Sequence, residues 1–224
     1  MPGISDNDGA GLNRLELADY LDADGGIVLP EGANLVTFLD RHIADIGDAV
    51  AYRFLDYSQD SDGKMIELTW AELGSRLRAI GARLQQITSK GDRVAILAPQ
   101  GIDYIIGFFA AIKAGNIAVP LFAPEFPGHA ERLDAVLGDA RPSVVLTTAG
   151  AAAAVQEFVR SLPRASRPRV IAIDEVPDSV GITFAPVRLD TDDIAYLQYT
   201  SGSTRSPVGV GSPIVRSAPT CCRW

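Results

Sequence analysis

Cysteine and histidine are nearly absent from this sequence. The only two cysteines, Cys221 and Cys222, stand side by side near the C-terminal end. The body of the chain therefore has neither a disulfide framework nor the paired cysteines of a zinc site. His42 and His129 are the only histidines, and they lie far apart in the sequence without an evident catalytic partner. This scarcity argues against a Ser-His-Asp hydrolase.

Clusters of basic residues and long apolar runs are absent as well. The formal net charge is −8, so we expect no nucleic-acid partner. The longest apolar stretch, 102–112, is interrupted by Asp103 and Gly107, and a membrane span needs about 18 apolar residues. No transmembrane segment is expected. The acidic, polar residues 1–10 lack the pattern of a signal peptide, and we expect a cytoplasmic protein.

What is present is an alternation of strand and helix patterns. The composition, 47% apolar and 21% charged over 224 residues, suits a globular domain with a buried core. Short apolar runs typical of strands covered on both faces alternate with helical segments from 93 to 174. This predicts the α/β class, a doubly wound, mainly parallel sheet with flanking helices. The predicted strands are 93–98, 117–122, 143–147, 170–174 and 194–199, and the predicted helices are 102–114, 129–138 and 150–162.

Several elements are expected upstream of this alternation. Residues 1–31, rich in Asp, Gly and Asn, predict a flexible N-terminal arm with a short helix near 13–21. Asn34 is expected to cap a helix that runs to about residue 46. Residues 49–57 and 64–68 predict a hairpin.

A further helix is expected after the hairpin. Thr69-Trp70-Ala71-Glu72 matches a capping box. The apolar stripe of this helix comprises Leu73, Leu77, Ile80, Leu84 and Ile87. Three arginines fall off this stripe and are expected to face solvent: Arg76, Arg78 and Arg83.

The last predicted strand leads into a loop of hydroxyls and glycine. The loop reads Thr200-Ser201-Gly202-Ser203-Thr204. Small side chains let a ligand approach the backbone, so that successive N–H groups can bind an anion. The spacing is not that of a Walker loop. Tyr199, just before the loop, is expected to pack in the core and is not a predicted site residue.

This loop resembles the phosphate loop of the adenylate-forming (AMP-binding) enzymes. The resemblance covers residues 199–204 together with Pro207 and Gly209, although Arg205 stands at the usual second glycine and Val208 at the usual lysine. Those two departures are similar to the fatty-acyl-AMP ligases of mycobacteria. Further blocks that support this subfamily are 51–56, 91–100, 117–122, 127–129 and 167–174. The match covers 35–210, the first portion of the family's N-terminal domain.

The resemblance implies a reaction. A fatty acid carboxylate attacks the α-phosphorus of ATP and gives acyl-AMP and pyrophosphate, with Mg²⁺ as metal ion. The acyl group then passes to an acyl-carrier protein or polyketide synthase in lipid biosynthesis. Thr200, Ser201, Gly202, Ser203 and Thr204 would hold pyrophosphate by positioning and electrostatics. Arg205 is either a further cationic contact to phosphate or an exposed arginine.

Parts of the family pattern are not found in this sequence. Residues 32–210 are expected to form a partial AMP-binding domain. The magnesium ligand and the domain with the catalytic lysine would lie downstream, so no catalytic residue is predicted and the chain alone is expected to be inactive. Residues 211–224 do not resemble the family's next segment. We hypothesise a frameshift near Val210, which fails if neither other reading frame resumes family-like sequence.

Two alternatives to the acyl-AMP ligase stay open. The first is a fragment of a fatty-acid–CoA ligase, with coenzyme A as the acceptor, against which Arg205 and Val208 argue. The second is a non-catalytic remnant that binds a carrier protein or an intact ligase.

Overall fold

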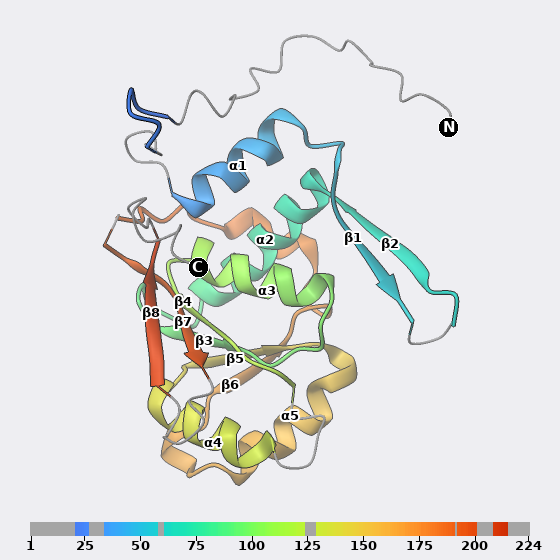
Figure 1. Ribbon diagram of the computed structural model, residues 1–224. Coiled ribbons are helices and arrows are strands. Elements are labelled where there is room, and N and C mark those ends of the chain that lie inside the picture. Colours follow the sequence, from blue (N-terminus) through green and yellow to red (C-terminus); the bar gives the residue numbers. More distant parts are fainter. Residues whose placement is uncertain are drawn as a thin grey trace.

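The computed structural model describes residues 21–26, 34–57, 61–123, 129–190, 192–200 and 208–214 (Figure 1). Most of the predicted N-terminal arm, including its short helix, lies outside these residues. Side chains are described throughout these ranges except at 129–131, 200 and 208.

A six-stranded sheet forms the centre of the described structure. Its strands are β3 (Arg93–Ile96), β4 (Ile117–Pro120), β5 (Val144–Thr147), β6 (Arg169–Ala172), β7 (Ile194–Thr200) and β8 (Val208–Pro213). They lie in the order β6-β5-β3-β4-β7-β8. All neighbours pair in parallel except β7 and β8, which are antiparallel. The prediction of a mainly parallel α/β sheet is confirmed.

Helices cover both faces of this sheet (Figure 1). One face carries α1 (Leu35–Asp45), α2 (Trp70–Gln85) and α3 (Ile102–Lys113), and the other carries α4 (His129–Ala140) and α5 (Ala149–Ser161). Side chains of a strand alternate between faces, so Val94 and Ile96 of β3 join the core beneath α2 and α3. Ala95 and the following Leu97 join the core against α4 and α5. Both cores are needed because each face of a parallel sheet is apolar.

The helix that Asn34 caps, the hairpin and the capping box at Thr69 are also confirmed. The Asn34 side chain accepts hydrogen bonds from the N–H groups of Val36 and Thr37 and so caps α1. Strands β1 (Val50–Asp56) and β2 (Lys64–Thr69) form a separate antiparallel hairpin, which extends away from the helices in Figure 1. Thr69 and Glu72 make the reciprocal bonds of a capping box at the start of α2.

The prediction that Arg76 faces solvent is wrong. Its side chain is only 19% exposed. Its guanidinium donates to the carbonyls of Ile173 and Val176 and to Asp178 Oδ1, at 2.6–2.7 Å. Sequence periodicity places Arg76 off the apolar stripe, but it cannot show that a distant segment packs there. That segment contains the 3₁₀ helix η3 (Asp178–Thr183), and a second one, η2 (Arg164–Ser166), precedes β6.

Strand β8 crosses the predicted domain boundary after residue 210. Its residues 211–213 continue the antiparallel pairing with β7. The assignment of 211–224 to a tail outside the family stays a prediction. Within the part of the chain described, no helix has the length and apolar character to cross a membrane.

Candidate functional site

Five parallel strands bring their carboxyl ends to one edge of the sheet. Ligands of such sheets bind beyond this edge, where successive connections leave for opposite faces. Here α3 links β3 to β4 on one face, and α4 links β4 to β5 on the other. The residues that follow β3, β4 and β7 therefore surround the expected ligand position.

The predicted phosphate loop begins at this edge. Thr200 is the last residue of β7, and its backbone pairs with Val208, the first residue of β8. Residues 201–207 thus connect two antiparallel neighbours. Ser201, Gly202, Ser203, Thr204 and Arg205 lie outside the described residues, so their binding role stays a prediction. A strand end on the carboxyl edge fits a site built from hydroxyls and backbone N–H groups.

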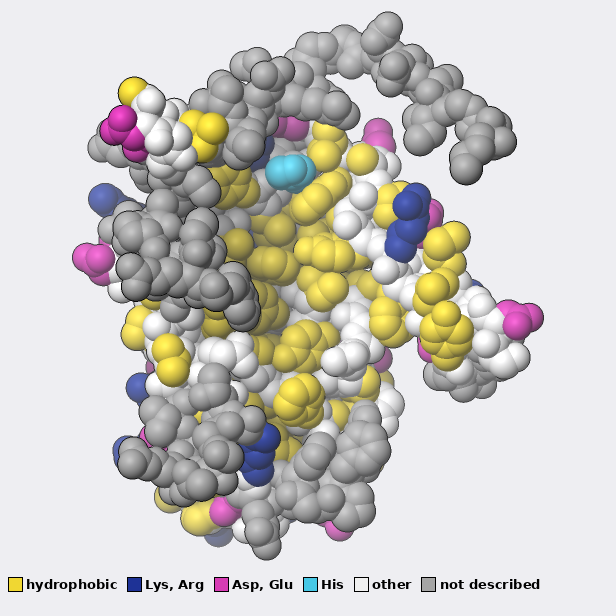
Figure 2. Space-filling view, in the orientation of Figure 1, with side chains coloured by type: hydrophobic (Ala, Val, Ile, Leu, Met, Phe, Trp, Pro, Cys, Tyr) yellow, Lys and Arg dark blue, Asp and Glu magenta, His cyan; other side chains and the backbone are white. Residues whose placement is uncertain are grey.

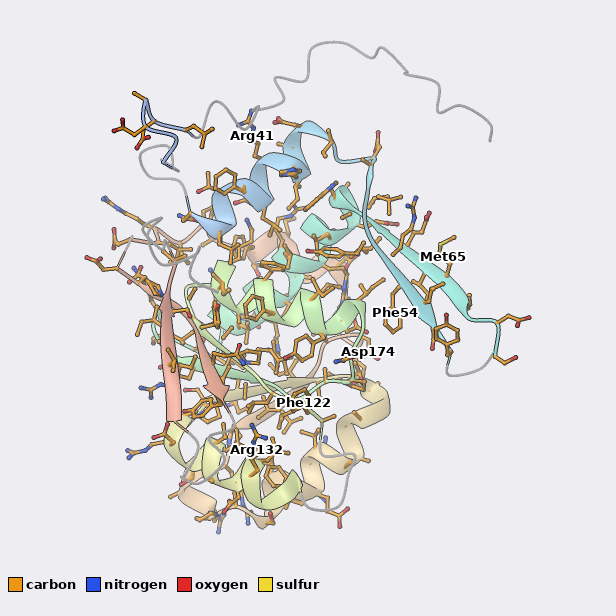
Figure 3. All side chains as sticks on the ribbon, in the orientation of Figure 1. Arg41, Phe54, Met65, Phe122, Arg132 and Asp174 are labelled. Atoms are coloured by element: carbon orange, nitrogen blue, oxygen red, sulfur yellow. The ribbon has the colours of Figure 1, made fainter. Side chains whose placement is uncertain are left out.

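A cavity of about 650 Å³ opens at the same edge. It lies among β1, the segment after β3, the start of α3 and the segment after β4. Its lining comprises residues 52–54, 98–102, Tyr104, Ile105, Phe122 and Ala123. Phe54 on β1 and Phe122 beyond β4 come to this region from separate elements (Figure 3). Most of the lining is apolar, and Phe122 is 61% exposed.

A second apolar groove adjoins the cavity. It has a volume of about 470 Å³ and shares Tyr52, Tyr104 and Ile105 with the first. Its other lining residues come from α1, α3, β4 and β7. Figure 2 shows hydrophobic side chains gathered over the centre of this face. An apolar surface of this kind is typical of a ligand site or a surface that another protein part covers.

Two acidic side chains interact near the start of α3: Asp103, the second residue of that helix, and Asp174, two residues after β6. Asp174 Oδ1 accepts a hydrogen bond of 2.8 Å from the N–H of Ala149, the first residue of α5. Figure 3 labels Asp174 in this region. Burial raises the pKa of the Asp103 carboxyl, the negative charge of Asp174 raises it further, and Arg76 partly opposes the rise. Partial burial and the nearby negative charge of Asp174 therefore disfavour the ionised form of Asp103.

Tyr199 packs in the core, as predicted. Its side chain is buried among the apolar residues between the sheet and α4. The hydroxyl donates to Asp139 Oδ2 on α4 at 2.6 Å. Burial, and then this bond, raises the pKa of the Tyr199 phenol. Tyr199, the residue before the predicted loop, is therefore hydrogen-bonded to helix α4.

The cavity was not among the sequence predictions. Pro99-Gln100-Gly101 was predicted only as a break after one strand, and Phe122 only as the last residue of the next strand. The rule that parallel strands bind ligands beyond their carboxyl ends points to both segments once the strand order is known. The contribution of β1 had no such signal, because nothing in residues 52–54 indicates that the hairpin reaches this edge.

Among the residues that the structure describes, no group of three or more His, Cys, Asp or Glu could hold a metal ion.

Comparison with known proteins gives consistent matches. A family model described as AMP-binding enzyme matches residues 39–212. The chain is 54% identical over 188 residues to the long-chain-fatty-acid–AMP ligase FadD32 of Mycolicibacterium smegmatis, covering 84% of this chain and 30% of that protein. It is 40% identical over 184 residues to the 4-hydroxyphenylalkanoate adenylyltransferase of Mycobacterium tuberculosis, covering 80% and 29%.

A solved structure shares the fold. The fatty acyl-adenylate ligase from L. pneumophila, determined in complex with acyl adenylate and pyrophosphate, matches with a TM-score of 0.70 and 27% identity. The match covers 81% of this chain and 30% of that one. The chain thus spans about 30% of the length of each of these three proteins.

Proposed function

Because the chain belongs to the AMP-binding enzyme family, we propose that it is the N-terminal part of a fatty-acyl-AMP ligase that converts a fatty acid and ATP to acyl-AMP and pyrophosphate. The observation that carries this proposal is the 54% identity to a long-chain-fatty-acid–AMP ligase over 84% of the chain. The position of Thr200 at the carboxyl edge of the sheet supports it independently, because that edge is where such folds bind ligands.

The proposed role of residues 200–205 is to hold the pyrophosphate that leaves ATP. Negative charge develops on this group as its bond to the α-phosphorus breaks. Backbone N–H groups and the hydroxyls of Thr200, Ser201, Ser203 and Thr204 stabilise that charge by donating hydrogen bonds from fixed positions. Arg205 adds a cationic contact. Val208 carries no charge and takes no part.

The remaining chemistry requires groups from outside this chain. Because the chain spans about 30% of the length of the ligases that it matches, we propose that the Mg²⁺ ligands and the catalytic lysine belong to the part of the relatives that this chain does not match. We accordingly expect the 224-residue chain alone to form no acyl-AMP. We further propose a cytoplasmic location, where ATP is available, and an acyl-carrier protein or polyketide synthase as acceptor in lipid biosynthesis.

A chimera tests the function directly. Residues 35–210 of this chain would replace the matching segment of the M. smegmatis ligase. We expect the chimera to catalyse ATP–pyrophosphate exchange that depends on added fatty acid, because the grafted segment supplies the phosphate loop and the ligase supplies the rest. The 224-residue chain is measured in parallel and should show no exchange.

Variants of the loop in the chimera test whether its hydroxyl groups contribute to the exchange reaction. The double variant Ser201→Ala/Thr204→Ala removes two proposed donors and should lower the exchange rate by about 10²-fold or more. Ser206→Ala, a hydroxyl deletion just outside the proposed set, is the matched control and should keep the rate. A folded chimera without exchange, or a double variant as active as the parent, contradicts the proposal.

A further inference from the structure

Helix α3 carries apolar side chains on two sides. The side that packs on the sheet is buried and includes Ile106, Gly107 and Ala110. A second apolar set recurs at spacings of three and four residues, as on one side of a helix, and comprises Tyr104, Ile105, Phe108 and Phe109. A helix that is apolar all round is usually buried all round. We therefore expect the second set to be covered by further protein.

This second set lines the apolar groove of about 470 Å³ that adjoins the cavity. The rest of the lining comes from four other elements and comprises Leu35, Tyr52, Pro120, Tyr196 and Gln198. Among the described residues that line the groove, none carries a charge. The centre of a protein–protein interface is likewise poor in charged residues and rich in aromatic ones.

Aromatic contacts fix the shape of the groove. The ring of Phe108 packs edge-on against the rings of Phe109 and Tyr196, with centroids 5.3 Å and 5.6 Å apart. The contact with Tyr196 joins α3 to β7. Side chains that already pack on one another lose little conformational freedom when a partner binds. The groove is therefore a preformed surface for a partner.

Two observations indicate what covers this groove. The chain spans about 30% of the length of the ligases that it matches, so a large part of such a ligase lies outside the match. The family match ends at residue 212 in β8, and β8 pairs with β7, whose Tyr196 and Gln198 line the groove. Under the proposed function, the rest of the ligase therefore continues from a strand that neighbours the groove. A second copy of this chain is a poorer occupant, because the net charge of −8 makes two copies repel each other.

We propose that the groove is the surface on which the remaining part of the ligase docks: an apolar segment of that part packs across Tyr104, Phe108 and Tyr196 and covers the outer side of α3. This inference rests on the proposed function and names the partner that the groove receives. It accounts for a helix that is apolar on two sides and for a groove lining without charge.

The test compares the 224-residue chain with the chimera in which residues 35–210 replace the matching segment of the M. smegmatis ligase. Hydroxyl-radical labelling with mass spectrometry measures the exposure of individual side chains in both proteins. We expect Tyr104, Phe108 and Phe109 to react severalfold more slowly in the chimera, because the rest of the ligase covers them. Ile182, which is 91% exposed and lies outside the groove, is the internal control and should react equally in both.

Equal reactivity of the groove in the two proteins overturns the proposal. Slow reaction already in the 224-residue chain also overturns it. The occupant is then a second copy where the rate falls with protein concentration, and the chain itself where the rate does not. Fatty-acid-dependent exchange by the chimera is measured separately. An active chimera with a reactive groove overturns only the docking, and an inactive chimera with a protected groove counts only against the proposed function.

A substitution in the groove gives a second measurement. Leu35→Asp places a charge at the groove wall, where Leu35 is 38% exposed. It should lower the melting temperature of the chimera by about 3 °C more than that of the 224-residue chain, because only the chimera buries the charge. Ile182→Asp is the matched control and should shift both proteins equally. Equal shifts for Leu35→Asp, or a chimera that does not unfold cooperatively, overturn the proposal.

Discussion

Asp103 is an acidic residue whose ionisation opposes the fold. Burial raises the pKa of its carboxyl, and the charge of Asp174 raises it further. A group whose pKa is higher in the folded than in the unfolded chain stabilises the fold while it is protonated. That contribution is complete below the unfolded pKa, about 3.9 for Asp, and is lost as the pH rises through the folded value.

Asp103→Asn should therefore stabilise the chain more at pH 7 than in acid. The amide cannot ionise, so the cost of a buried charge disappears. We expect the melting temperature of the variant, relative to the wild type, to rise by about 2 °C between pH 4 and pH 7. Asp103→Glu, which keeps a titrating carboxyl, should follow the pH dependence of the wild type. A relative melting temperature that is constant over this range would contradict the assignment.

At the scale of elements, hydrogen bonds from Arg76 join the segment after β6 to helix α2. Its guanidinium contacts two backbone carbonyls and Asp178, at the entry to η3. These bonds join residues about one hundred positions apart in the chain. Ile173 and Val176 flank Asp174, so these bonds from Arg76 also maintain the position of Asp174.

Arg76→Met should lower the free energy of unfolding by about 2 to 3 kcal/mol. Methionine replaces most of the apolar stem, but the carbonyls of Ile173 and Val176 lose their donor. Arg78→Met on the same helix is the matched control, since Arg78 is exposed, and it should change stability by about 0.5 kcal/mol or less. Urea denaturation of the two variants measures the difference, and equal losses would refute the structural role of Arg76.

At the scale of the whole molecule, an apolar face and a net negative charge act in opposite directions. Large hydrophobic side chains exposed on the described surface include Leu55, Met65, Phe122, Ile182 and Val210. Surfaces of this kind favour association. The net charge of −8 makes copies of the chain repel one another, and salt screens that repulsion.

We expect self-association to increase between about 0.02 M and about 0.5 M NaCl, as measured by light scattering. The variant Leu55→Ser/Met65→Ser, on the exposed hairpin, should reduce the increase and lower the binding of a hydrophobic dye. Asp62→Ser in the turn of the same hairpin is the control and should not reduce it. A chain that stays monomeric at high salt would show that the apolar face is too small to drive association.

The sequence predicts the sheet and its helices because their signals are local. Alternation of apolar runs identifies the strands, and Asn34 and Thr69 mark helix starts by hydrogen bonds within their own segments. The packing of Arg76 and the arrival of Phe54 at the cavity were not predictable. Both depend on contacts between segments far apart in the chain, and neither residue type indicates its partner.

The candidate site likewise has features that the sequence predicts and features that it does not. The end of β7 at the loop was predicted, since a strand pattern stops where hydroxyls and glycine begin. The bond from Tyr199 to Asp139 was not, because a tyrosine in a strand reads as an ordinary core residue. The role of residues 201–205 stays a prediction that the chimera would test.

The strand order also determines when the sheet can be completed during synthesis of the chain. Strand β4 pairs with β7 through Ala118 and Tyr196, so one side of β4 has no partner until residues 194–200 have left the ribosome. Pairing between strands so distant is slow to form. Until then the nascent chain exposes an apolar strand edge, which attracts other strands and chaperones. Residues 194–213 therefore complete the sheet and include the predicted phosphate loop, and a nascent chain released before Ile194 would lack both.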